Sequence, residues 1–441
     1  MKVFKALAAV LVAASLCAPS GAEAAQKTLK LSLPDAISMA RENNNTIKAA
    51  KSRVEQAEGR IVQSRQSYLP SLTLSENFVR TNDPLNVFGI KLMQANVQQT
   101  DFYAPSLNEA DPISDFNTSL QLMQPIFNRD GAIGRGMAKK AKVAEEFMTA
   151  RTEETIDLYV SKAYYGLMLA QYNIAAVDQS IATMKRHSAE AEKAFRAGML
   201  PKSDKLSTEV RLAELREQKM MLEDGAKNAV DALSVLLNLE EGVRVEPTGA
   251  LAVDAEIPSF ADVAVEGDRS DLRAMETYRE LAEKQGDMAR AGRIPRLNAF
   301  ARADNHTADF DTDGSSWMVG MSLEWKIFDG MAISGKVQEA KAREREARYS
   351  YDAAKSNSVA EVARALRSMR TAKERVGVAG QALEEAKVSL DYIGGQYRTG
   401  KAMTFELLMR EGAYTYAMMR LNQAKFDYCV AKSELTYYGA K

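Results

Sequence analysis

Cysteine and histidine are scarce in this chain of 441 residues. Its two cysteines are Cys17 and Cys429, and its two histidines are His187 and His306. They form no Cys–His cluster, which argues against a histidine-based metal site, and we expect both histidines at the surface. The chain also lacks a phosphate-binding loop with its lysine. We therefore expect no enzyme activity, no catalytic residue, no metal and no cofactor.

An excess of charge of either sign is also missing. The 58 Lys and Arg residues nearly balance the 59 Asp and Glu residues, so the net charge is −1. This balance gives no electrostatic case for a nucleic-acid partner. After the N-terminal segment, no apolar run approaches the roughly 20 residues of a transmembrane helix.

The N-terminus has the pattern of a secretory signal peptide. Lys2 and Lys5 precede an apolar run over 7–16, and small residues follow at Ala22 and Ala24. We expect residues 1–24 to be removed, with cleavage after Ala24 or after Ala25. Cys17 would be lost with them, since a lipid-modified cysteine normally follows a small residue and Leu16 is not small; lipidation at Cys17 is the alternative. The single remaining Cys429 excludes an intramolecular disulfide.

Proline is absent from two long tracts. None of the 11 prolines lies between 126 and 200 or between 296 and 441. Because proline costs about 3 kcal/mol in a helix interior, these tracts permit long helices. We predict such helices over about 131–197 and 331–397. Partner helices are expected over about 34–65, 201–238, 265–291 and 401–439.

Apolar periodicity indicates that the chain is an internal duplication. In both long tracts, apolar residues recur at alternating steps of three and four, as in a coiled-coil seam. The second seam runs through Val359, Val362, Leu366, Met369, Ala372, Val376, Ala379, Leu383, Ala386, Leu390, Ile393 and Tyr397. Moving back by about 202 residues gives the first: Val160, Tyr164, Leu167, Ala170, Ile174, Val177, Ile181, Met184, Ser188, Ala191 and Phe195. The decapeptides FRAGMLPKSD (195–204) and YRTGKAMTFE (397–406) end the two tracts. We therefore predict a first structural repeat over 25–250 and a second over 251–441.

Four short segments alternate with period two and are predicted strands. They cover about 70–80, 116–127, 295–304 and 316–328. On the last, Trp317 and Trp325 share the apolar face about 26 Å apart. Such spacing is typical of aromatic girdles at two membrane interfaces; the alternative is a half-buried strand with two core tryptophans. Glu76 falls on the apolar face of the first strand, so we expect that strand to be short or to end there.

The loops between the strands differ in length. The first, 81–115, is long and polar, whereas the second, around 306–315, is short. Four strands are too few to close a barrel, whose smallest common size is about eight, so several chains would have to contribute strands to one barrel.

The order of these motifs resembles the TolC family of outer-membrane efflux ducts. It runs LSLPDAISMARENN (31–44), a helix, YLPSLTLS, a strand ending in QPIFN, a long helix, FRAG and a second helix, and then repeats, ending in YRTGKAMTFELLMREGAYTYAMMRLNQAKFDYCVAKSEL. The resemblance covers essentially the whole mature chain. It implies a mainly α protein with a membrane β-barrel part: a homotrimer with one 12-strand barrel in the outer membrane lipid and a long α-helical barrel across the periplasm.

The resemblance also implies partners and site residues. The two decapeptides would be hairpin tips that meet a periplasmic adaptor protein, with an inner-membrane pump of the resistance-nodulation-division or ABC type behind it. The tip residues are Phe195, Gly198, Ser203, Tyr397, Gly400 and Thr404. Glycine suits these helix ends, and Ser203 and Thr404 can cap the next helices.

The resemblance places a periplasmic gate at the same tips. Glu406 lies six residues after Gly400, where the family has an acid that lines the closed aperture, and Asp204 on the partner hairpin is a second gate candidate. A further acid often lies three residues on, but this chain has Met409, and Glu411 is not assumed to replace it.

The sequence is compatible with two classes of function. The first is a passive exit duct of a tripartite efflux or type I secretion system, with drugs, metal ions or proteins as cargo. The alternative is a periplasmic coiled-coil adaptor or structural envelope protein. That alternative explains the seams and the signal peptide, but neither the paired amphipathic strands nor the duplication.

Overall fold

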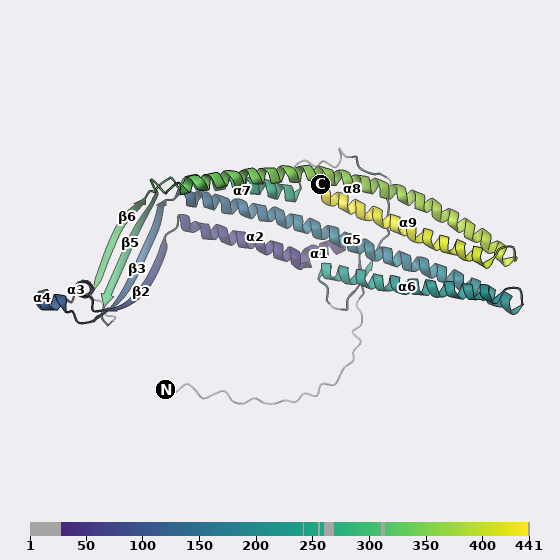
Figure 1. Ribbon diagram of the computed structural model, residues 1–441, viewed down its shortest axis with the longest axis horizontal. Coiled ribbons are helices and arrows are strands. Elements are labelled where there is room, and N and C mark those ends of the chain that lie inside the picture. Colours follow the sequence, from purple (N-terminus) through teal and green to yellow (C-terminus); the bar gives the residue numbers. More distant parts are fainter. Residues whose placement is uncertain (1–27, 241, 255, 260–268, 310–313, 440–441) are drawn as a thin grey trace, which may run out of the picture.

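The computed structural model describes residues 28–439 except 241, 255, 260–268 and 310–313. The molecule is elongated, with a β-sheet at one end and helices along the rest of its length (Figure 1). The predicted signal peptide and Cys17 lie outside the described residues.

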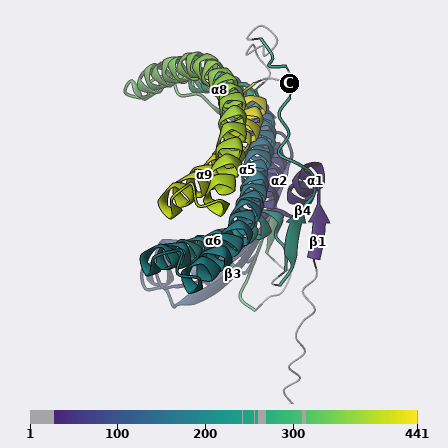
Figure 2. The same ribbon diagram turned by 90° about the vertical axis from the view of Figure 1, so that its right-hand side faces the viewer.

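Two very long helices form the frame of the molecule. Helix α5 (Arg129–Arg196) has 68 residues and α8 (Ala332–Arg398) has 67, so each is about 100 Å long. Helix α6 (Lys202–Leu237) returns along α5, and α9 (Thr404–Tyr438) returns along α8. The result is two helical hairpins whose turns lie at the end of the molecule opposite the sheet (Figures 1 and 2).

Shorter helices accompany the halves of α5 and α8 nearer the sheet. They are α1 (Leu33–Asn43), α2 (Asn45–Gln63) with the 3-10 turn η1 (Ser64–Ser67), and α7 (Ser270–Ala291). The single helix expected over about 34–65 is interrupted at Asn44. The Asn44 side chain accepts hydrogen bonds from the N–H groups of Thr46 and Ile47 and donates one to the carbonyl of Leu236. The chain is therefore re-capped there, and a second helix begins.

The sheet has four antiparallel strands in the order β2–β3–β5–β6. The strands are β2 (Ser71–Thr81), β3 (Ile113–Phe127), β5 (Arg296–Thr307) and β6 (Ser315–Glu324). The expected end of the first strand at Glu76 is wrong. Strand β2 continues to Thr81, because Thr118 opposite Glu76 donates a hydrogen bond to its carboxylate.

The connection between β2 and β3 is not irregular. It contains α3 (Pro84–Met93), η2 (Gln99–Phe102) and α4 (Ala104–Asn108), which lie beyond the far end of the sheet (Figure 1). Next to this connection, His306 Nδ1 lies 2.8 Å from Asp115 Oδ2, and both side chains are buried. The expectation of a surface His306 is therefore wrong, since a partner carboxylate compensates its burial.

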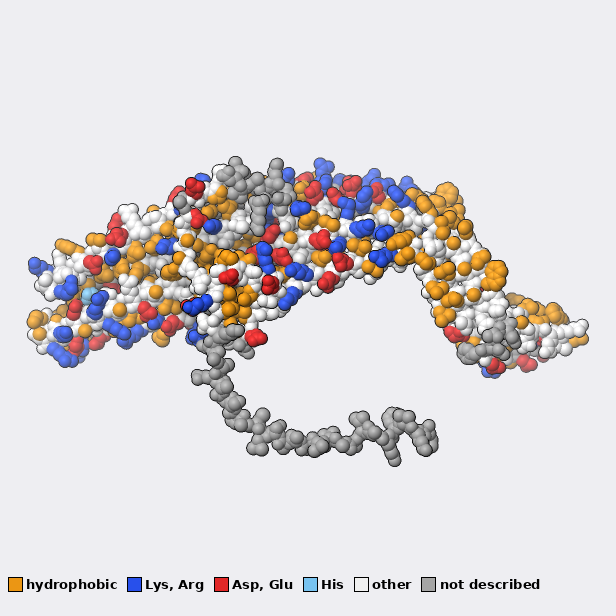
Figure 3. Space-filling view, turned by 180° about the vertical axis from the view of Figure 1, so that it is seen from behind, with side chains coloured by type: hydrophobic (Ala, Val, Ile, Leu, Met, Phe, Trp, Pro, Cys, Tyr) orange, Lys and Arg blue, Asp and Glu red, His pale blue; other side chains and the backbone are white. Residues whose placement is uncertain are grey.

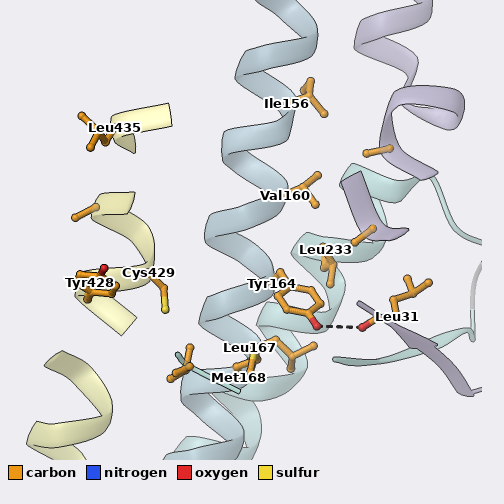
Figure 4. Close-up of a cluster of buried hydrophobic side chains, with 14 of the residues drawn as sticks. Leu31, Ile156, Val160, Tyr164, Leu167, Met168, Leu233, Tyr428, Cys429 and Leu435 are labelled. Atoms are coloured by element: carbon orange, nitrogen blue, oxygen red, sulfur yellow. Dashed lines mark hydrogen bonds between the residues drawn. The ribbon is translucent and has the colours of Figure 1, made fainter. Parts of the chain in front are cut away.

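The largest core lies midway along the molecule. There β1 (Thr28–Leu31) pairs in parallel with β4 (Arg244–Pro247), a two-stranded sheet that the sequence did not predict. Tyr164 of α5 is buried against it, and its hydroxyl lies 3.0 Å from the carbonyl oxygen of Leu31 (Figure 4). The small parallel sheet is thus fixed to α5 at this level.

Most residues of the two predicted seams are buried, among them Val160, Tyr164, Leu167, Val177, Ile181, Met184, Val362, Leu366 and Met369. Val359 is an exception: it is exposed, and the adjacent Ser358 is buried instead. The small Ser358 takes the inward position one turn before Val362.

Candidate functional site

The two hairpin tips have the same backbone geometry. Gly198 and Gly400 both have a φ of 71°, a left-handed conformation that favours glycine. Met199 N–H donates to the carbonyl of Ala194 at 2.8 Å, and Lys401 N–H donates to that of Gln396 at 2.9 Å. Each bond closes the last turn of a long helix in the manner of a Schellman motif. The two tips therefore match each other down to individual hydrogen bonds.

The predicted caps at the tips are wrong. Helix α6 begins at Lys202, so Ser203 already lies inside the first turn, and its hydroxyl bonds Asp204 rather than a backbone N–H. Helix α9 begins at Thr404 itself, whose buried hydroxyl has no hydrogen-bond partner among the described residues. The N-cap positions are instead Pro201 and Met403, so neither hydroxyl caps its helix.

The two predicted gate acids occupy equivalent places. Asp204 and Glu406 are each the third residue of the helix that follows a tip. Negative charge is favoured there by the helix dipole. Glu406 also helps to cap the N-terminus of α9, since its carboxylate accepts a 3.0 Å hydrogen bond from the N–H of Met403. The rest of the Glu406 side chain is exposed at the tip.

The aromatic residues before the two glycines contact neighbouring helices. The Lys205 ammonium group lies 5.6 Å from the ring centroid of Phe195. Tyr397 of α8 meets His187 of α5 edge to face, with centroids 6.4 Å apart. His187 is half-buried, with 14% of its side chain exposed, so it is less open than the expected surface residue.

A polar chain that the sequence did not reveal joins the two hairpins. Arg211 Nε of α6 donates to the carboxylate of Glu411 of α9 at 2.9 Å. Glu411 is 1% exposed and also accepts a 2.7 Å hydrogen bond from Thr415. The Thr415 hydroxyl lies 2.6 Å from that of Ser180 on α5. The ion pair and the hydrogen bonds thus link α6, α9 and α5 in the part of the hairpins near the tips. We call these four residues the hairpin link.

The hairpin link stabilises the charged form of Arg211. Burial alone disfavours the guanidinium, but the hydrogen bond and negative charge of Glu411 outweigh it and raise the pKa of Arg211 above its ordinary value. The Glu411 carboxylate is buried in this link and is not exposed at the tip. It therefore does not replace the second acid that the family often has at the position of Met409.

Apolar side chains are exposed at the tips themselves. Met199, Met403 and Phe405 are among the most exposed large hydrophobic residues of the described chain. Single exposed hydrophobic residues are normal on a protein surface, and these three lie at or next to the two turns.

One face of the sheet is apolar across all four strands. The cross-strand register places Leu74, Leu120, Ala303 and Trp317 side by side, and Leu72, Leu122, Ala301 and Val319 form the next row. Trp317 is 77% exposed. Figure 3 shows hydrophobic side chains covering the sheet, whereas charged side chains are spread along the helices. No other element of the described chain covers this face.

Both outer strands of the sheet are open. In the described chain β2 pairs only with β3, and β6 pairs only with β5. Side chains on both faces of these two strands are exposed almost throughout. An unpaired strand edge is a ready template for another strand.

Trp325 does not lie on β6 as expected. The strand ends at Glu324, and the Trp325 indole N–H donates to the carbonyl of Arg293 at 3.1 Å. This bond holds the ring against the turn between α7 and β5. The side chain is nevertheless exposed beside the end of the sheet.

No metal centre appears in the part of the chain that the structure describes. There, no three His, Cys, Asp or Glu residues are grouped to hold a metal ion. In the same part, none of the helices has the length and apolarity needed to cross a membrane.

Comparison with known proteins extends over most of the chain. A family described as "Outer membrane efflux protein" matches residues 36–239 and 264–438. The alkaline protease secretion protein AprF of Pseudomonas aeruginosa is 22% identical, over 92% of this chain and 84% of its own. The outer membrane protein TolC of Vibrio cholerae is 20% identical, over 91% of this chain and 89% of its own. The solved CmeC outer membrane channel of Campylobacter jejuni has a TM-score of 0.79 at 18% identity, covering 92% of this chain and 85% of its own.

Proposed function

The chain belongs to the outer membrane efflux protein family, and we propose from this membership that it forms the exit duct of a tripartite efflux or type I secretion system. It is a protein of the outer membrane with a large periplasmic part, and it acts as a passive channel rather than as an enzyme. It works as a homotrimer with a periplasmic adaptor and an inner-membrane pump. The pump selects the cargo, and the duct conducts it.

The open edges of the sheet carry the proposal for the membrane part. Three copies would join β6 of one protomer to β2 of the next and close a single 12-strand barrel. The alternating strand directions support this closure, because β6 and the next β2 then meet antiparallel like every other pair in the sheet. The continuous apolar face would point to lipid, as in outer-membrane barrels.

The two helical hairpins would form the periplasmic part. Three copies supply six hairpins, and their seams would pack into a hollow α-helical barrel of about 100 Å. In this arrangement residues 1–24 are removed, and 25–250 and 251–441 form two structural repeats. The matching backbone hydrogen bonds at the two tips support the duplication.

The tips would contact the adaptor and contain the gate. Exposed Met199, Met403 and Phe405 support an apolar contact there. The proposed adaptor contacts are Phe195, Gly198, Ser203, Tyr397, Gly400 and Thr404. Glu406, with Asp204, would line the closed aperture, and the hairpin link would hold the two hairpins of a protomer together in the closed state.

Trp317 and Trp325 would form the membrane girdle. They lie at different heights of β6 and the turn that follows it, and both are exposed. Tryptophan favours the interface because its ring is apolar and its N–H is polar. The Trp325 N–H donates to the carbonyl of Arg293, and this bond holds the ring at the end of the sheet nearest the helices.

Inter-subunit strand pairing is tested by disulfide formation. Thr73→Cys on β2 is combined in turn with Met318→Cys, Ser322→Cys or Glu324→Cys on β6, which lie on the same face of the sheet. The control pair Thr73→Cys with Gln121→Cys joins residues that are opposite each other within one chain. We expect oxidation to yield trimers for at least one β2–β6 pair and monomers for the control, with a native mass of three chains. A folded monomer without cross-links contradicts the proposal.

The periplasmic adaptor alternative is less compatible with these observations. An adaptor would have no use for a four-stranded sheet that is apolar and exposed across one face. Membrane fractionation separates the two functions, since a duct sediments with the outer membrane and an adaptor is released or follows the inner membrane.

A further inference from the structure

The connection between β2 and β3, residues 82–112, is tied to the far end of the sheet by buried polar contacts. The side-chain amide of Gln94 donates to Asp115 Oδ1 at 2.9 Å and to the carbonyl oxygen of Ser114 at 3.0 Å. His306 Nδ1 lies 2.8 Å from the other carboxylate oxygen of Asp115. All three side chains are buried, so the partners of the carboxylate compensate the loss of its hydration. We call Gln94, Asp115 and His306 the outer latch.

The outer latch lies on the face of the sheet opposite the apolar one. Successive side chains of a strand point to opposite faces, so Asp115 shares its face with Gln121, whereas Leu120 belongs to the apolar face. His306 is paired across the strands with Asn117, which is on the same face as Asp115. In the proposed barrel this face lines the channel. The outer latch therefore holds the end of α3 on the channel side of the sheet.

A close contact at a glycine fixes the same end of α3 a second time. A Cβ on Gly314, the residue before β6, would lie 2.5 Å from the carbonyl oxygen of Met93 and closer still to that of His306. Backbones can approach this closely only where the residue has no side chain. The N–H of His306 also donates to the carbonyl of Gly314 at 3.1 Å. The β2–β3 connection is thus held by the outer latch and by the residue that leads into β6.

The β2–β3 connection is also packed within itself. Lys91 near the end of α3 forms a 2.7 Å ion pair with Asp101 of η2. The rings of Phe88 and Phe102 meet edge to face, with centroids 5.5 Å apart. These contacts join α3 to η2 across the turn between them, so the connection acts as one body.

Apolar side chains of this connection are exposed, and nothing in the described chain covers them. Leu85 is 79% exposed and Phe102 is 61% exposed, and Leu92, Tyr103 and Leu107 are exposed as well. Figure 3 shows hydrophobic side chains at this end of the molecule, beyond the sheet. Single exposed apolar residues are normal on a protein surface, but a group of them within one short connection is a candidate contact surface.

The other copies of the chain are the partner that this surface fits. The connection directly follows β2, the open strand that the proposed barrel joins to β6 of the next protomer. Each connection is then at the mouth of the channel and next to a second protomer. Because the outer latch holds it on the channel side, its apolar side chains are directed away from the lipid. Three identical surfaces around one symmetry axis can cover one another.

We propose that the three β2–β3 connections of a trimer meet at the channel axis and close its outer mouth. The outer latch holds each connection on the channel side, and Leu85, Phe102 and Tyr103 contact the other two copies. This closure is separate from the gate at the hairpin tips, so the channel has a barrier at each end. The inference rests on the proposed function, because it requires the trimer and its barrel.

The first test measures access to the channel from outside the cell. Gln121→Cys places a thiol on the channel face of β3, further from the mouth than the outer latch, and Cys429 is buried in the core. Intact cells are treated with a maleimide that carries a bulky charged dye and cannot cross the outer membrane. Gln121→Cys is labelled alone and combined with Gln94→Ala, which removes the donor of the latch, or with Gln94→Glu, which places a second carboxylate against Asp115. The control combination uses Glu109→Ala, since Glu109 is an exposed residue of the same connection and has no ion pair in the described chain.

We expect slow labelling of Gln121→Cys alone and with Glu109→Ala. Either Gln94 variant should accelerate labelling at least about tenfold, which corresponds to about 1.4 kcal/mol in the opening equilibrium. All variants should keep the native mass of three chains. Rapid labelling of Gln121→Cys alone, or equal rates for the Gln94 variants and the control, overturns the closure.

The second test measures the contact between copies. Leu85→Cys, Phe102→Cys and Tyr103→Cys are made singly, and mild oxidation of the trimer should link two protomers through at least one of them. If none of the three is linked, the surface does not contact its own copies, and lipid is the better candidate for covering it.

A third variant separates this closure from the proposed function. Glu109→Cys should be labelled rapidly on intact cells, because the connection then lies outside the outer membrane. Its failure to be labelled refutes the proposed function and this closure with it. Rapid labelling of Glu109→Cys together with a negative result in either of the first two tests refutes the closure alone.

Discussion

Arg211 and Glu411 form an ion pair at 2.9 Å although 200 residues separate them in the sequence. One residue belongs to the first helical hairpin and the other to the second. The carboxylate is buried, and the pair adds a charged contact to the apolar cluster that already packs the two hairpins together.

Breaking the pair should loosen the tips. Arg211→Met leaves the buried Glu411 carboxylate without its cation, and removing one partner of a buried pair costs about 3 kcal/mol or more. We expect a lower midpoint of thermal unfolding and a higher single-channel conductance in planar bilayers. Arg216→Met, which removes an exposed arginine further along α6, is the control and should change neither quantity. Unchanged conductance of Arg211→Met would show that the hairpin link does not contribute to closure.

The charge of Glu406 can be separated from its capping role. In Glu406→Gln the side-chain carbonyl can still accept the Met403 N–H, but the negative charge is lost. We expect weaker cation selectivity and weaker block by multivalent cations, with trimer assembly and thermal stability nearly unchanged. Reversal potentials in a salt gradient measure the selectivity. If selectivity equals that of wild type while Glu406→Ala lowers stability, Glu406 is only a helix cap.

The two tryptophans should be needed for membrane insertion. Trp317→Asp and Trp325→Asp place a charge at the expected lipid interface and should lower the amount of protein in the outer-membrane fraction several-fold. Ser322→Asp lies on the opposite face of β6 and should be tolerated. Trp325→Phe removes the hydrogen bond to Arg293 and part of the apolar ring surface, and should have an intermediate effect. Equal damage from all the aspartate variants would favour a buried core strand.

Cys429 should be inert in the folded protein. It is buried in the central core, and burial raises the pKa of its thiol to about 11. The reactive thiolate is therefore scarce at neutral pH, because only pH values near the raised pKa would populate it. We expect no labelling by a maleimide at pH 7 until the protein is unfolded, followed by one label per chain. Rapid labelling of the native trimer would contradict this burial.

The sequence identified the features that repeat or alternate over many residues. Proline-free tracts and the three-four spacing predicted α5 and α8, and period-two alternation predicted the four strands of the sheet. Both signals are local, and each is supported by many residues at once.

Features that depend on distant partners were missed. His306 is buried because Asp115 lies beside it, and Asn44 interrupts a helix while bonding Leu236; neither partner is near in sequence. The cap positions at Ser203 and Thr404 failed for a different reason, since a shift of a helix start by one or two residues moves a hydroxyl from outside the helix to inside it. The pairing of Arg211 with Glu411 required the relative position of the two hairpins.

The small parallel sheet in the centre of the molecule has a consequence for the order of folding. Strand β1 is near the beginning of the chain, but its partner β4 follows roughly 200 residues later. Contacts of such large sequence separation form slowly, because the intervening chain has to be ordered first. The hairpin of α5 and α6 contains mostly local contacts and can form early. The chain would therefore complete its tip before its middle, and a chaperone that protects the exported chain would be needed longest at the β1 segment.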